Sequence, residues 1–159
     1  MIHSAQSERK IAALNGLRVA ETVSVVPHIV HMSPWAGPDT RWLAELVDGI
    51  VQERLVAIDW LSHRIADLGR EPHSGNPPAD LAGLHYHSYA YLLTRIQADL
   101  HRVADAYARL MPALQDDAVL CQEVGRLAEM LAAELAQLDG AAQRVAQARA
   151  TPPAAAESA

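Results

Sequence analysis

Apolar residues recur at steps of three and four along most of the chain, which is the spacing of helices with one buried face. The longest such run predicts a helix over residues 40–68. Its apolar positions are Leu43, Leu46, Val47, Ile50, Leu55, Ile58, Leu61, Ile65 and Leu68. A Gly-Pro-Asp turn precedes this helix, so we expect Asp39 or Thr40 to cap it and Gly69 to supply a left-handed exit.

Three weaker runs predict the remaining helices. They cover about residues 8–26, 90–110 and 117–148. Pro27 has no N–H to donate to a helical ladder, so it is expected to end or kink the first helix near His28.

The connection between the second and third predicted helices is long. Residues 69–80 contain two Gly and three Pro and predict an ordered loop, followed by a short helical piece at about 80–89. A connection that crosses the length of a bundle is a feature of ferritin-like folds. We therefore predict an all-α, ferritin-like four-helix bundle in one domain over residues 1–150, with residues 1–8 frayed and residues 151–159 as a disordered tail.

Composition agrees with this class. Hydrophobic residues are 50% of the chain but aromatic residues only 4%, so the apolar content is mostly Ala, Leu and Val, which suits closely packed helices. The single cysteine, Cys121, excludes an intrachain disulfide framework. Without a signal peptide or an apolar run of membrane length, we expect a cytoplasmic protein.

Charge argues against a nucleic-acid surface. The net charge is −6 and Lys10 is the only lysine. Near the N-terminus only Arg9 accompanies it, and no basic residue follows Arg149. Neutralising several phosphates takes several cations, so we expect no direct DNA binding.

A second stripe on the helix over residues 40–68 carries candidate metal ligands. Asp48, Gln52, Asp59 and His63 follow one another at steps of four, seven and four, which places them on one face. Asp48 and Asp59 are eleven residues apart, roughly 16 Å along the helix axis. A metal–oxygen bond is only about 2 Å, so both ends can share an ion only if a second chain lies antiparallel across the first.

The internal metal motif of ferritin-like bundles is missing. Such bundles carry two Glu-x-x-His motifs, but Glu53 is followed three residues on by Val56, and Glu134 by Gln137. We therefore expect no internal di-iron centre. The four acids that such a centre could have used are expected on solvated faces or in local pairs: Glu21, Glu53, Asp99 and Glu134.

The stretch 37–72 resembles the Dps family, the DNA-protection-during-starvation miniferritins. The family's second helix follows a H-W-x-x-x-G-P-x turn, reads roughly R-x-L-H-E-x-x-D, continues eleven residues later with D-x-x-x-E-R, and ends in L-G-G-x-P. The matching residues, in register and without a gap, are Gly37, Pro38, Asp39, Arg41, Leu43, Glu45, Asp48, Asp59, Arg64, Leu68, Gly69 and Pro72. An Ala-Leu-Asn start at residues 13–15 is also similar, and the resemblance covers about residues 12–148.

The resemblance implies iron chemistry between chains. Dps-like proteins hold a ferroxidase centre at a two-fold interface, assemble as twelve-subunit shells, oxidise ferrous iron and store the mineral. Two positions depart from the pattern: Ala44 replaces the family's His, and His63 replaces its Glu. His31 lies six residues before Gly37, where the family's His lies five before.

The expected ligand set is therefore His31 and Asp48 from one chain with Asp59 and His63 from its mate. Asp48, Asp59 and His63 would carry the ferroxidase reaction. Two nitrogen and two oxygen donors suit ferrous iron and zinc equally.

Other polar groups carry weaker signals. Asp116 and Asp117, at the start of the last helix, match the region that lines an entry pore in Dps-like shells, although acids in a first turn also suit the helix dipole. His85 and His87 are interpreted as surface or interface residues, and His101 as exposed. The tryptophans, at positions 35, 42 and 60, are interpreted as core or interface aromatics.

The preferred hypothesis is a Dps-like, homo-oligomeric ferroxidase that stores iron and limits peroxide damage. Two alternatives stay open. One is a ferritin-like structural or adaptor bundle that has lost oxidation chemistry, as Ala44, Val56 and Gln137 would suggest. The other is a protein that binds zinc without redox turnover.

Overall fold

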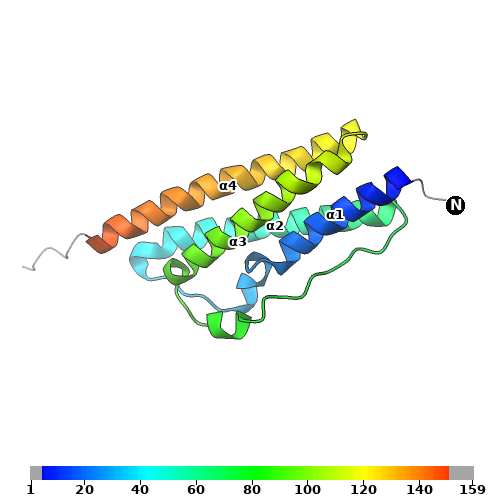
Figure 1. The fold of residues 1–159 in the computed structure, drawn as a ribbon. Helices are drawn as coiled ribbons and strands as arrows, with labels where there is room; N and C mark the ends of the chain where they lie inside the picture. The colour runs from blue at the N-terminus through cyan, green and yellow to red at the C-terminus, as the bar shows by residue number, and fades with distance from the viewer. Residues whose placement is uncertain (1–4, 151–159) are drawn as a thin grey trace, which may run out of the picture.

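Four long helices make up most of residues 5–150, the part of the chain that the computed structural model describes (Figure 1). They are α1 (Ala5–Val23), α2 (Arg41–Asp67), α3 (Tyr89–Leu110) and α4 (Ala118–Ala150). Short 3₁₀ turns join them: η1 (Val26–His31), η2 (Pro38–Thr40), η3 (Leu81–Leu84) and η4 (Met111–Leu114). Within the described residues the only β-type contact is an isolated bridge between Trp35 and Ser88, so the predicted all-α class is confirmed.

Three of the four helix boundaries fall within two residues of those predicted. The first helix is the exception. It begins at Ala5, so the expectation of fraying is wrong for residues 5–8, while residues 1–4 and the predicted tail, 151–159, lie outside the described part. It also ends at Val23, ahead of Pro27, because Ser24 donates its hydroxyl to the Glu21 carbonyl and the chain turns into η1.

Helix ends follow the expected chemistry in part. Gly69 leaves α2 with φ of +75°, as predicted. The predicted cap at Thr40 is wrong, because its hydroxyl donates to the Gly37 carbonyl and makes no capping bond. The helical piece expected at 80–89 is a single 3₁₀ turn, since Tyr86 has φ of +61° and Ser88 then caps α3 by accepting from Tyr91 N–H.

The helices lie side by side, and the colours of Figure 1 show α2 and α3 running in the same direction. Close backbone packing joins α1 to α2, α1 to α3 and α3 to α4. The long connection between α2 and α3 returns along α1. There Gly75 passes so close that a Cβ would lie 2.1 Å from Val23 Cγ2, so any other residue at this position would force the Val23 side chain to move.

Helix α2 and helix α4 are joined by arginine contacts at three levels. The Arg144 guanidinium lies 3.9 Å from the centre of the Trp42 ring. Midway, Arg54 Nη2 lies 3.0 Å from Glu134 Oε1. At the other end Arg64 Nη2 lies 3.1 Å from Glu123 Oε2. Along these contacts the residue numbers rise on α2 and fall on α4, so the two helices are antiparallel.

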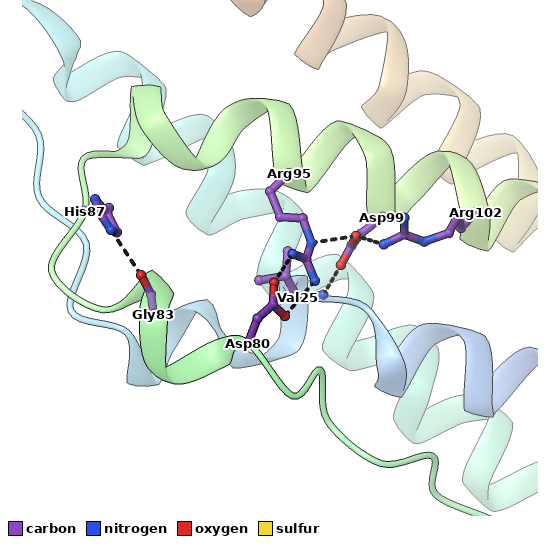
Figure 2. Close-up of polar contacts among 7 residues, drawn as sticks. All are labelled: Val25, Asp80, Gly83, His87, Arg95, Asp99 and Arg102. Carbon is purple, nitrogen blue, oxygen red and sulfur yellow. Dashed lines mark hydrogen bonds and ion pairs between the residues drawn. The ribbon is translucent and has the colours of Figure 1, made fainter.

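A buried carboxylate at Asp99 ties α3 to two connecting segments (Figure 2). Its Oδ2 accepts from Val25 N–H at 2.6 Å, and its Oδ1 accepts from Arg95 Nε at 3.0 Å and from Arg102. Arg95 also pairs with Asp80, at the start of η3. The expectation of a local pair is therefore confirmed for Asp99, which pairs with two arginines of its own helix and is 1% exposed.

Removal of the Asp99 carboxylate should loosen this junction. We expect Asp99→Ala to lower the free energy of unfolding by about 1–3 kcal/mol, because the buried Val25 N–H loses its acceptor. Asp105→Ala removes an exposed carboxylate from the same helix and should change it by less than about 0.5 kcal/mol. Urea unfolding of wild type and both variants measures these differences in the free energy of unfolding. Equal midpoints for the two variants would contradict the prediction.

Candidate functional site

The three ligand candidates on α2 lie on one uninterrupted helix, Arg41–Asp67. Asp48, Asp59 and His63 are all exposed, as their phase predicts. The helix therefore presents an acid near its start and an acid–imidazole pair near its end, on the side away from the bundle core.

Asp48 lies at the edge of a pocket of about 290 Å³ between η1, α2 and the start of α3. Tyr89 donates its hydroxyl to Asp48 Oδ1 at 2.8 Å. Burial and the Asp48 carboxylate raise the pKa of Tyr89 to about 12, so the phenol remains a donor at neutral pH. This hydrogen bond holds the Asp48 carboxylate toward the pocket.

The Asp59–His63 pair forms one turn of helix. His63 Nδ1 lies 2.9 Å from the Asp59 carbonyl oxygen and 3.4 Å from Asp59 Oδ2. The carbonyl contact, followed by the Asp59 charge, raises the pKa of His63. In the neutral ring Nδ1–H donates to that carbonyl, which leaves Nε2 with a free lone pair for a ligand.

His31 is exposed at the end of η1. Its neighbours Ile29 and Val30 line the pocket at Asp48, but His31 does not. Ala44, where the resembling family has a histidine, is half-buried against the core.

One chain alone does not complete a metal site. Within residues 5–150, no three His, Cys, Asp or Glu side chains lie close enough together to hold an ion. Any cation held by Asp48, Asp59 and His63 would need a second chain.

The predicted pore residues have partners inside the chain. Gln6 donates to Asp116 Oδ2 at 2.7 Å, and Lys10 Nζ lies 3.3 Å from Asp117 Oδ2. Asp117 Oδ1 accepts from Leu120 N–H at 3.1 Å, and this bond is the main cause of its lowered pKa. Asp117 thus caps α4, which is the helix-dipole role that its position also allowed.

The exposure of the histidines and tryptophans agrees with their interpretation as surface, core or interface residues, but Trp35 does not lie in the core. His85 and His101 are exposed, and His87 stacks on Tyr91 with ring centres 4.0 Å apart. Trp42 and Trp60 pack half-buried against the core. Trp35 is 58% exposed, so a core role is wrong in this chain, and its indole N–H donates to the Tyr86 carbonyl.

A buried ionic cluster in the bundle core was missed by the sequence analysis. Each helix contributes one residue: Glu21 from α1, Arg54 from α2, Tyr107 from α3 and Glu134 from α4. Arg54 is 0% exposed, and its guanidinium lies 3.1 Å from Glu21 Oε1 and 3.0 Å from Glu134 Oε1. Tyr107 donates its hydroxyl to Glu21 Oε1 at 2.9 Å.

This cluster corrects the expectation for two acids. Glu21 and Glu134 are buried, not solvated, because Arg54 gives them a cation inside the bundle. Only Glu53 is exposed as expected. The signal was present: Arg54 falls in phase with the apolar positions Ile50 and Leu61.

Charge balance in the cluster requires a proton. Two buried carboxylates face one guanidinium, and burial raises the pKa of Glu21 and raises that of Glu134 to about 8. The Glu53 carboxyl beside Glu134 acts in the same direction. At neutral pH a proton on one of these carboxyls leaves one buried anion for one buried cation, and Glu134, whose pKa is raised to about 8, is able to hold it.

Stability should fall as pH rises through this range. Glu134 titrates near 4.5 when unfolded and at about 8 when folded, so between these values the folded state binds more protons. In the Glu134→Gln variant the side chain at this position is neutral at every pH. The variant should therefore lose less stability than wild type between about pH 5 and about pH 8. Acids with lowered pKa values, such as Asp117, change the free energy of unfolding with pH by the same amount in both proteins.

Urea unfolding at a series of pH values measures this difference. Glu129→Gln, an exposed position on the same helix, should follow the wild-type curve. Parallel curves for wild type and Glu134→Gln would show that Glu134 ionises normally in the folded protein.

Comparison with known proteins does not assign the chain to a family. No protein-family model matches the chain, and no curated protein matches it significantly. No helix in residues 5–150 is both long and apolar enough to cross a membrane.

Proposed function

We propose that this protein is a Dps-like miniferritin, whose subunits oxidise ferrous iron at two-fold interfaces and store the product in a closed, twelve-subunit homo-oligomeric shell. The observation that carries the proposal is the outer stripe of α2. It has Asp48 near one end, Asp59 and His63 near the other, and all three side chains are exposed.

The middle of the stripe suits a helix-to-helix contact. Val56 lies between the two ends, in phase with them, and is 66% exposed. If a mate crosses antiparallel so that its Asp59 faces Asp48, residues 53 and 54 lie at the two-fold axis, and Val56 lies less than one helical turn from it. The two Val56 side chains would then be covered by the mate on either side of the axis, and two symmetric metal sites would lie further out.

The donor set suits ferrous iron as a substrate. Asp48 and Asp59 offer oxygen, His63 Nε2 offers nitrogen, and His31 is the proposed fourth ligand. Two ferrous ions each give one electron to one hydrogen peroxide. Its O–O bond breaks, and two protons convert its oxygens to two water molecules while two ferric ions form. Consumption of peroxide with iron would limit oxidative damage.

The proposed fold family is the ferritin-like bundle with its long crossover between α2 and α3. The parallel direction of these helices and the η3 turn within the connection support it. Asp116 and Asp117 stay candidates for an entry pore, although both already have partners near the start of α1.

The second candidate is a structural or adaptor bundle without oxidation chemistry. Ala44 favours it, because a ligand position of the resembling family is filled by a residue that packs on the core. Zinc binding by the same four donors, without turnover, is the remaining alternative.

Iron oxidation should depend on Asp59. With anaerobic ferrous iron followed by peroxide, we expect wild type to give a rapid rise in ferric absorbance, and Asp59→Ala to lose at least tenfold in initial rate. Asp105→Ala, an exposed acid on α3, should match wild type. An undiminished rate in Asp59→Ala would remove the assignment, and a flat trace for wild type would favour the structural or zinc alternatives.

Assembly should depend on Val56. Val56→Glu places a carboxylate on each side of the proposed axis, inside the interface, so we expect a shift toward monomer in analytical ultracentrifugation. Val119→Glu makes the same change at a 62% exposed position on α4 and should leave the sedimentation unchanged. A wild-type protein that sediments as a monomer would contradict the interface itself.

A further inference from the structure

The Arg54 cluster lies in the bundle core, which is where other four-helix proteins build metal sites. In di-iron and di-manganese bundles, carboxylates from all four helices and two histidines converge on the core. Here all four helices also converge at one level, but with Glu21, Arg54, Tyr107 and Glu134. No histidine takes part, and the two carboxylates contact a guanidinium.

The residues present do not fit a core metal. Arg54 Nη1 and Nη2 lie 3.1 Å and 3.0 Å from the two carboxylates, so the space between these acids is filled by a covalently attached cation. A divalent ion there would face the positive guanidinium at close range, which is strongly repulsive in a buried setting.

We propose that the Arg54 guanidinium is the resident cation of a core carboxylate site, taking the place of a divalent metal ion, so that the bundle closes without metal. The two carboxyls that contact it are buried and need a counter-charge. Glu21 is 0% exposed and Glu134 is 2% exposed, so each requires a positive partner or a proton inside the core. Glu53 adds a third carboxyl beside Glu134.

The proposal has a direct consequence. If the guanidinium is removed and the carboxylates stay, the space should accept an external cation of the right charge and size. Arg54→Ala opens this space, whereas Arg54→Leu fills it with apolar atoms. Arg54→Lys keeps a tethered cation.

Cobalt(II) is the probe, because its visible absorption reports coordination by protein ligands. All proteins carry Asp48→Asn, Asp59→Asn and His63→Gln. These substitutions remove the proposed metal ligands on the surface of α2, so the result does not depend on the proposed ferroxidase. The parent with Arg54 should show no saturable cobalt band. Arg54→Ala should gain one cobalt per chain, and Arg54→Ala with Glu134→Gln should lose at least tenfold in cobalt affinity.

Thermal melts give a second readout. Without metal, Arg54→Ala and Arg54→Leu should melt well below the parent, and Arg54→Lys should lie between. Cobalt should raise the melting temperature of Arg54→Ala alone. If Arg54→Ala is unfolded in the absence of metal, cobalt should restore its helical circular dichroism.

Three results would overturn the proposal. The first is a cobalt band in the parent that Glu134→Gln abolishes, since the core would then take a metal beside Arg54. The second is an Arg54→Ala protein as stable as the parent without any added cation. The third is an Arg54→Ala protein that cobalt neither binds nor stabilises.

Discussion

A charge removed from water must find an opposite charge within bonding distance, and in this bundle that constraint falls on Arg54. Its guanidinium is fully buried and has a carboxylate on α1 and another on α4 as partners, with a tyrosine from α3 completing the set. Buried ion pairs of this kind are seldom more stabilising than well-packed apolar residues, but loss of one partner is costly. Our hypothesis for this protein is that the cluster selects one arrangement of the four helices, because few other arrangements pair all the charges.

The same constraint determines what α2 presents outward. Arg54 shares the inner face of α2 with Val47, Ile50 and Leu61, all buried. A helix whose inner face is held by a buried ion pair cannot rotate without breaking it. The outer stripe, with Asp48 and His63, is therefore held in the orientation that the proposed two-fold site needs. Core and surface are coupled through a single helix.

Much of the fold follows from local signals. Apolar periodicity predicted four helices because each one buries a continuous stripe, and Gly69 marked the end of α2 because its conformation suits glycine. The failures lie in the turns, where other bonds replace the expected helical ones. Thr40 bonds backward to Gly37 and does not cap the helix, and the expected helix near residue 85 is interrupted at Tyr86.

The candidate site divides in the same way. The exposure of Asp48, Asp59 and His63 could be predicted, since it follows from helical phase alone. The hydrogen bond from Tyr89 to Asp48 could not be predicted, because it depends on where the long connection places the start of α3. The apolar phase of Arg54 indicated a buried cation, but it could not show that Glu21 and Glu134, on other helices, are the buried acids that pair with it.

The three arginine contacts between α2 and α4 have a consequence for axial alignment. Surfaces rich in alanine and leucine present similar ridges at every turn, so a shift of one turn, about 5.4 Å, leaves much of their packing intact. Guanidinium groups have no such tolerance. A one-turn slide of α4 would part Arg144 from Trp42, Arg54 from Glu134 and Arg64 from Glu123 simultaneously. The three contacts therefore permit only one axial position of α4 against α2, although the apolar packing surface of α4 repeats along its length.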